Sequence, residues 1–164
     1  MIINFSFNIY SKIFYRFILV FMLFKTSNIM ANLIVANNSN YTNYLNALVP
    51  GDTLYLRQGV YDKNLKLNGL NGTPLEPIVI IGEANKTIFI GQSCCNTVSI
   101  TKCSYLVIKN IQLDGQNLSI DAVKAEGTTG NWAHHITIEY LNIINYGNSQ
   151  QNVGISTKCS AWNW

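Results

Sequence analysis

The chain has 164 residues, of which 48% are hydrophobic and only 12% charged, and its formal net charge is +3. Three of the 11 basic residues and none of the 8 acidic ones lie in residues 1–31, so the remainder carries eight of each. A neutral remainder lacks the basic surface that binds phosphate backbones, which excludes nucleic acid as a partner. Its roughly 130 residues suit a single domain.

Residues 1–31 are predicted to be a signal peptide. Lys12 and Arg16 precede an apolar run over residues 17–24, which is too short to cross a bilayer as a helix. A basic segment, a short apolar core and then Ala31 are typical of a secretory leader. We therefore expect a secreted or cell-surface protein with no membrane attachment after cleavage. Cleavage at Ala36 and an uncleaved anchor are the alternatives.

A short helix is expected over residues 41–49. Its apolar residues at 41, 44, 45 and 48 share one helical face, and Asn40 or Ser39 is the expected N-cap. Pro50 and Gly51 then end the helix. Such a helix would cap the first strands of a solenoid, whose sheet edges are otherwise unpaired.

Short alternating strands and a repeat follow the cap. Residues 101–104 (Thr-Lys-Cys-Ser) recur at 157–160, with a weaker copy at 131–134, and residues 105–113 align with 135–143. A 30-residue period without helices predicts a right-handed parallel β-helix of three sheets, an all-β solenoid. Residues 32–164 would be its N-terminal part, truncated at the C-terminus. The expected strands are 53–56, 65–67, 78–81, 87–90, 98–100, 106–108, 111–113, 122–125, 136–138, 141–143 and 153–156, with another starting at 162.

Period-two alternation predicts which side chains point inward and stack from coil to coil. The inward stacks are expected to be Leu106/Ile136/Trp162, Ile108/Ile138/Trp164, Ile111/Leu141, Leu113/Ile143 and Val98/Val123/Val153. The outward stacks are expected to be Val107/Thr137/Asn163, Lys109/Glu139, Ser99/Lys124/Gly154 and Thr101/Glu126/Ser156. Lys109 and Glu139 would form a surface ion pair.

The four cysteines do not indicate a zinc site, because no paired CxxC spacing occurs. The repeat puts Cys103 and Cys159 at one corner two coils apart, roughly 9–10 Å at the strand spacing, which is beyond disulfide reach. Pairing of Cys94 or Cys95 with Cys103 stays open.

Residues 48–61, 77–80, 88–91 and 105–111 resemble secreted right-handed β-helix proteins of the pectate lyase superfamily, especially its alginate and chondroitin lyase branch. The likeness covers residues 33–164. It implies a polysaccharide ligand and, in the lyase branch, a catalytic Lys and Arg with calcium-binding carboxylates on later coils. The one arginine after the leader, Arg57, lies in the capping segment.

Five residues are candidates for binding substrate. Lys124 and Glu126 project from one strand face between small residues, which leaves room for a sugar ring. Trp132 offers a surface on which a sugar ring could stack, and His134 and His135 follow it. Each has a structural alternative: a solvated Lys–Glu pair, or ordinary turn residues. The catalytic residues stay unknown.

We expect a monomer that binds polysaccharide and, if the protein is an enzyme, cleaves a uronate polymer by β-elimination. A non-catalytic adhesin-like solenoid and a uronan epimerase are the alternatives. No metal site is assigned, although calcium is compatible with the full-length protein through oxygen ligands such as Asp121 and Glu126.

Overall fold

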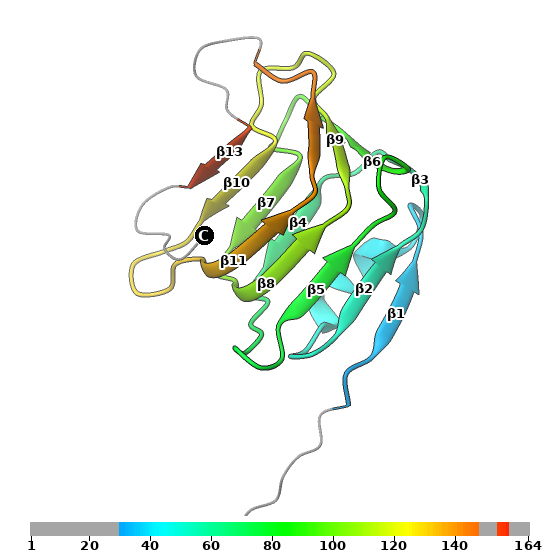
Figure 1. Ribbon diagram of the computed structural model, residues 1–164. Coiled ribbons are helices and arrows are strands. Elements are labelled where there is room, and N and C mark those ends of the chain that lie inside the picture. Colours follow the sequence, from blue (N-terminus) through cyan, green and yellow to red (C-terminus); the bar gives the residue numbers. More distant parts are fainter. Residues whose placement is uncertain (1–29, 148–153, 158–164) are drawn as a thin grey trace, which may run out of the picture.

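The computed structural model describes residues 30–147 and 154–157, which form a right-handed parallel β-helix (Figure 1). The chain winds through three parallel sheets, and each strand pairs with its equivalent one coil later. The β1–β11 sheet contains β1 (Leu33–Ala36), β2 (Thr53–Leu56), β5 (Ile78–Ile81), β8 (Ser104–Lys109) and β11 (His134–Glu139). The β4–β13 sheet contains β4 (Leu65–Asn68), β7 (Val98–Thr101), β10 (Val123–Glu126) and β13 (Ile155–Thr157). The β3–β12 sheet contains β3 (Gly59–Tyr61), β6 (Thr87–Ile90), β9 (Gln112–Asp114) and β12 (Asn142–Ile144).

The core consists of inward columns, one side chain from each coil. Most strands alternate buried and partly exposed residues, as period-two alternation requires. The columns are Leu54/Ile80/Ile108/Ile138, Ile78/Leu106/Ile136, Leu65/Val98/Val123 and Tyr61/Phe89/Leu113/Ile143. Ile155 continues the third column in register but is 47% exposed. The predicted pairs of Leu106 with Ile136, Ile108 with Ile138 and Leu113 with Ile143 are therefore confirmed.

The predicted register of the last strand is wrong. Ile155 pairs with Val123, and Ser156 pairs with Lys124, where Val153 and Gly154 were expected. Thr157 consequently aligns with Ala125, whereas Thr101 aligns with Glu126. Thr157, the first residue of the second Thr-Lys-Cys-Ser copy, is thus one residue out of register with Thr101, and the rest of that copy lies outside the described residues. The connection between β12 and β13 is longer than the one between β9 and β10, which a fixed repeat could not anticipate. Residues 158–164, including Trp162, Trp164 and Cys159, lie outside the described part.

Two single-turn 3-10 helices replace the predicted cap helix. They are η1 (Tyr41–Asn43) and η2 (Leu45–Ala47). η2 lies against β4, which is the edge strand of the β4–β13 sheet. Asn40 occupies the N-cap position of η1, but its side chain makes no capping hydrogen bond there. Its Oδ1 instead accepts from the backbone N–H of Asn37 at 2.9 Å. The capping position was predicted correctly, and the helix type was not.

Residues with left-handed backbone conformation recur at equivalent corners of successive coils. Tyr105 (φ 48°) aligns with His135 (φ 52°) at the start of β8 and β11. Asn110 (φ 58°) and Tyr140 (φ 53°) turn the chain after those strands. Non-glycine residues rarely adopt this conformation, so its repetition indicates a corner whose shape the stacking determines.

Lys109 and Glu139 are neighbours in register, as predicted. Within residues 30–147, however, the expected ion pair between these two side chains does not form.

The cysteines differ from every pairing considered from the sequence. Adjacent Cys94 and Cys95 form a disulfide with each other. Cys103 is a buried free thiol that donates to the carbonyl of Thr101 at 3.3 Å, which rules out its pairing with either of them. Burial raises the pKa of the Cys103 thiol, so it behaves as a small core residue.

The predicted leader lies outside the described residues, apart from its last two positions. In the described part of the chain, no helix is long and apolar enough to cross a membrane.

Removing part of an inward column should destabilise the solenoid. Ile108 is 1% exposed, so Ile108→Ala should cost about 2–5 kcal/mol of unfolding free energy through the cavity it leaves. The matched variant Lys109→Ala, at the outward neighbour, should shift the unfolding free energy by no more than about 0.5 kcal/mol. Urea denaturation of both variants measures the difference. Equal effects would contradict the inward assignment of Ile108.

Two buried tyrosines should ionise at a higher pH than an exposed tyrosine does. Burial raises the pKa of Tyr41 and of Tyr61 to about 12, and their hydroxyls donate to the carbonyls of Lys63 and Arg57 at 2.8 and 2.7 Å. Because an unfolded tyrosine ionises near pH 10, their contribution to stability is complete below that pH and is lost as pH rises towards 12. Absorbance at 295 nm should follow the late ionisation. A titration complete by pH 11 would contradict it.

Candidate functional site

The outward face of the β4–β13 sheet carries a column of lysines and serines. Lys66 pairs with Ser99, Ser99 with Lys124, and Lys124 with Ser156. With neighbouring strands about 4.8 Å apart, the two lysines stand roughly 10 Å apart along the solenoid axis. The small serine between them leaves open surface. Two cations at this separation along the axis suit an extended polymer with repeated anionic groups.

Lys66 was missed as a site residue. Its strand was recognised from Leu65-Lys66-Leu67, and the strand at 98–100 was recognised too, but the pairing of these two strands was not. The pattern Leu-Lys-Leu matches Val98-Ser99-Ile100, and this was the available signal.

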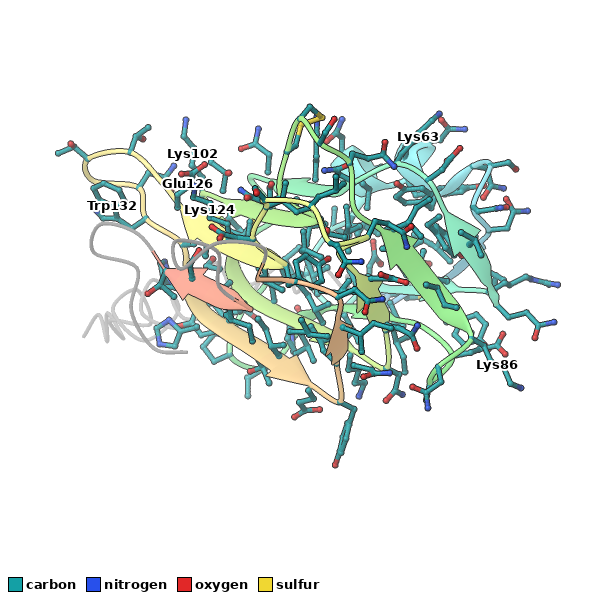
Figure 2. All side chains as sticks on the ribbon, turned by 90° about the horizontal axis from the view of Figure 1, so that it is seen from above. Lys63, Lys86, Lys102, Lys124, Glu126 and Trp132 are labelled. Carbon is teal, nitrogen blue, oxygen red and sulfur yellow. A yellow bond between two sulfur atoms is a disulfide. The ribbon has the colours of Figure 1, made fainter. Side chains whose placement is uncertain are left out.

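A second outward column runs beside the first. Asn68 pairs with Thr101, and Thr101 with Glu126, which stands two residues from Lys124 on the same face of β10. The backbone N–H of Lys102 donates to the Glu126 carbonyl at 3.3 Å. Figure 2 shows Lys102, Lys124 and Glu126 gathered on one part of the molecule. The face thus presents ammonium groups, which attract carboxylates, and carboxylate, hydroxyl and amide groups, which can hydrogen-bond to sugar hydroxyls.

Trp132 belongs to a tight loop that follows β10. Thr128 and Asn131 exchange backbone hydrogen bonds of 3.2 and 2.8 Å, with Gly130 in the left-handed conformation (φ 79°) between them. A Cβ on Gly127 would lie 2.6 Å from Trp132 Cα and 3.1 Å from its ring carbon Cε3. The indole is therefore held close to the backbone just beyond Glu126, and it is half-buried (Figure 2).

His134 and His135 begin β11 and so lie on a different sheet from Lys124 and Glu126. Their Nδ1 atoms are 2.8 Å apart, and the ring of His135 stacks on Tyr105 with centroids 4.3 Å apart. Burial, together with the charge of His135, lowers the pKa of His134. His135 and Tyr105 line an open groove of about 600 Å³ with Pro74 and Pro77.

The five predicted residues thus divide between two sheets. Lys124 and Glu126 share a face, and Trp132 stands on the loop leading away from it. His135 lines the groove on the β1–β11 sheet, and His134 precedes His135 in β11.

The two carboxylates considered for calcium do not converge. Asp121 precedes β10 and accepts from the Ser156 hydroxyl at 3.2 Å, whereas Glu126 ends that strand. The strand alone separates them by about 10 Å. No group of three or more His, Cys, Asp or Glu side chains suited to a metal ion occurs within the described ranges.

Comparisons with known proteins identify the fold. The PL6 family alginate lyase AlyGC superimposes with a TM-score of 0.57 at 18% identity, over 68% of this chain and 15% of that one. The GH136 lacto-N-biosidase from Eubacterium ramulus superimposes with a TM-score of 0.56 at 15% identity, over 90% of this chain and 33% of that one. The chain therefore spans a small fraction of the length of either enzyme. No protein-family model and no curated protein matches the sequence.

The loop that carries Trp132 provides a test of the site geometry. Gly127→Ala places a methyl against the Asn131 carbonyl and Trp132, so it should displace the indole and cost about 1–3 kcal/mol. In a background with Trp162 and Trp164 changed to Phe, Trp132 fluorescence should shift to longer wavelength. Thr128→Ala keeps the loop backbone and is the control. An unchanged spectrum in the Gly127 variant would contradict the described packing.

Proposed function

We propose that this β-helix binds a uronate-containing polysaccharide along the outward columns of the β4–β13 sheet. The observation that carries the proposal is the column in which Lys66 and Lys124 alternate with Ser99 and Ser156. Ammonium groups bind carboxylates, and the small residues between them leave space for sugar rings. Trp132, close beyond Glu126, offers an apolar ring face for the C–H surface of a sugar.

We further propose β-elimination as the reaction if a longer protein with this segment is catalytic. Such a lyase removes the proton next to the uronate carboxylate, so it needs a cation at that carboxylate and a base at the carbon. Lys124 or Lys66 suits the first role. The base stays unassigned. The shared fold with an alginate lyase supports this reaction class without assigning it, since a fold hosts many functions.

A non-catalytic, adhesin-like solenoid is the second candidate, and Arg57 favours it. This arginine, the one that follows the leader, comes after β2 and lines a groove with Tyr55 and Glu83, away from the β4–β13 sheet. An epimerase would share the proton abstraction and then return the proton to the sugar. Polysaccharide binding is common to all three proposals.

The remaining expectations stay proposals. We propose that residues 1–31 direct secretion, that residues 32–164 belong to one β-helix domain, and that this domain acts as a monomer. Calcium binding would be a property of a longer protein with carboxylates on later coils, since Asp121 and Glu126 stand apart.

A lyase assay distinguishes the catalytic from the binding proposal. Full-length protein is incubated with alginate, pectate or chondroitin, with and without calcium, and absorbance near 235 nm reports unsaturated uronate. Growth of the absorbance with one polymer is the expected result for a lyase. Absence of signal with all three would reject β-elimination, and a binding signal with the same polymers would then favour the adhesin-like protein.

Binding itself depends on the column lysines. Lys124→Met keeps the aliphatic stem and removes the charge, so affinity for an alginate hexasaccharide should fall about two- to fivefold. Lys109→Met, on the outward face of another sheet, is the matched control and should bind like wild type. Isothermal titration calorimetry measures both. Equal affinities for the two variants would remove Lys124 from the site.

A further inference from the structure

A polar groove lies where the cap meets the first strand of the β4–β13 sheet. Its volume is about 610 Å³. One side comes from the cap, through Leu45 and Asn46, and the floor from the outward residues Lys66 and Asn68 of β4. Cys94, in the loop between β6 and β7, also lines the groove. Segments distant in the sequence therefore build one concave surface.

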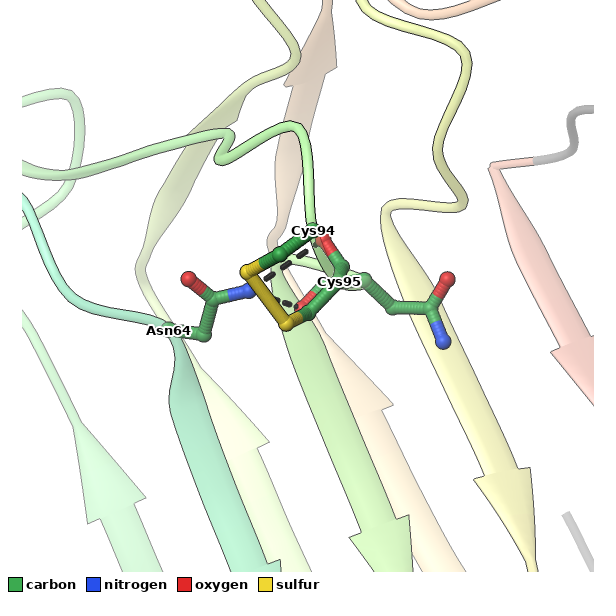
Figure 3. The surroundings of a disulfide bond; sticks show 4 residues. Asn64, Cys94 and Cys95 are labelled. Carbon is green, nitrogen blue, oxygen red and sulfur yellow. Dashed lines mark hydrogen bonds between the residues drawn. A yellow bond between two sulfur atoms is a disulfide. The ribbon is translucent and has the colours of Figure 1, made fainter.

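The loop that carries Cys94 is held rigidly. The disulfide between Cys94 and Cys95 closes a ring within two consecutive residues, and the backbone N–H of Cys95 donates to the Gln92 carbonyl at 3.2 Å. Asn64, only 8% exposed, donates through Nδ2 to the carbonyls of Cys95 and Asn96 at 3.2 and 2.6 Å (Figure 3). This one amide thus fixes the base of the loop, and Cys94 lines the groove.

The groove is chemically suited to an acidic sugar. Lys63 and Lys66 supply two positive charges against the single negative charge of Asp62. Side-chain amides, among them Asn46 and Asn68, offer hydrogen bonds to hydroxyl groups. The disulfide adds a small apolar surface beside these polar groups.

The groove is also continuous with the proposed polysaccharide surface. Lys66 belongs both to the groove and to the outward column that continues through Ser99 to Lys124. β4 is the last strand of its sheet on this side, and η2 lies against it. A polymer that follows the column therefore meets the cap at this groove.

We propose that this groove is a terminal binding site for one uronate residue of a polysaccharide chain, with the Cys94–Cys95 disulfide as its preformed wall. The ligand class rests on the proposed function, and the site extends it to residues that the columns do not include. Because the disulfide limits the conformations of the loop, the site is already shaped before the sugar arrives, which lowers the entropic cost of binding.

A charge variant tests the ligand class. Lys63 is exposed and lines the groove, and Lys86 is exposed on the turn between β5 and β6; Figure 2 shows them at opposite edges of that end of the molecule. Lys63→Met should weaken binding of an alginate hexasaccharide about two- to fivefold in calorimetry, while Lys86→Met should not change it. A neutral cellulose hexasaccharide should bind the wild type at least about threefold more weakly, by the same charge term. Equal affinity for both sugars would overturn the acidic class.

A disulfide variant tests the wall of the groove. Replacing both Cys94 and Cys95 by Ser should weaken binding about three- to tenfold, because the loop must then be ordered by the ligand. Treatment of the wild type with dithiothreitol, which gives two electrons and two protons to the disulfide and yields two thiols, should have the same effect. The urea midpoint of each form shows whether the fold is retained. Wild-type affinity in a folded, disulfide-free protein would overturn the role of the disulfide.

The two levels of the hypothesis fail differently. In one outcome, the wild type binds the hexasaccharide and Lys124→Met weakens that binding, while Lys63→Met and the double serine variant both bind normally. The groove is then not a binding site, and the column remains one. If the wild type binds neither sugar, the proposed function and the groove site are both rejected.

Discussion

In-register stacking of like residues is the constraint on which this structure depends. A parallel sheet pairs each residue with the equivalent residue one coil later, so every inward position must remain apolar along the whole column. Columns such as Leu54/Ile80/Ile108/Ile138 satisfy that requirement. The same pairing fixes the outward positions. Lys66, Ser99 and Lys124 are aligned because Leu65, Val98 and Val123 are aligned beneath the surface.

Regular coils were predictable from sequence where the connections between strands keep their length. The 30-residue offset between β8 and β11 is correct residue by residue, since both coils turn at two-residue corners such as Asn110 and Ile111. β13 was placed wrongly because the connection that precedes it is longer. The short strands β1 and β3 gave too little alternation to be distinguished from turns. The Cys94–Cys95 disulfide has no spacing signal, because its two residues are adjacent.

The candidate site was predictable only in part, for a related reason. Lys124 and Glu126 are two residues apart in one strand, so alternation alone puts them on one face. Lys66 joins them through a pairing across 33 residues, which required the register of β4 on β7. His134 and His135 follow Trp132 closely in sequence, but the corner after the loop moves them to another sheet. Proximity in the chain therefore does not imply a shared face where the solenoid turns a corner.

The corners have unequal freedom, and this has an evolutionary consequence. Between β8 and β9, and again between β11 and β12, the chain turns in two residues, whereas the connections on both sides of the β4–β13 sheet vary from coil to coil. Those variable segments include the Trp132 loop and the disulfide loop. Insertions or deletions there would reshape the walls of the proposed ligand surface without changing any inward column. Specificity in such a molecule can diverge through loop length while the inward columns keep their sequence and register.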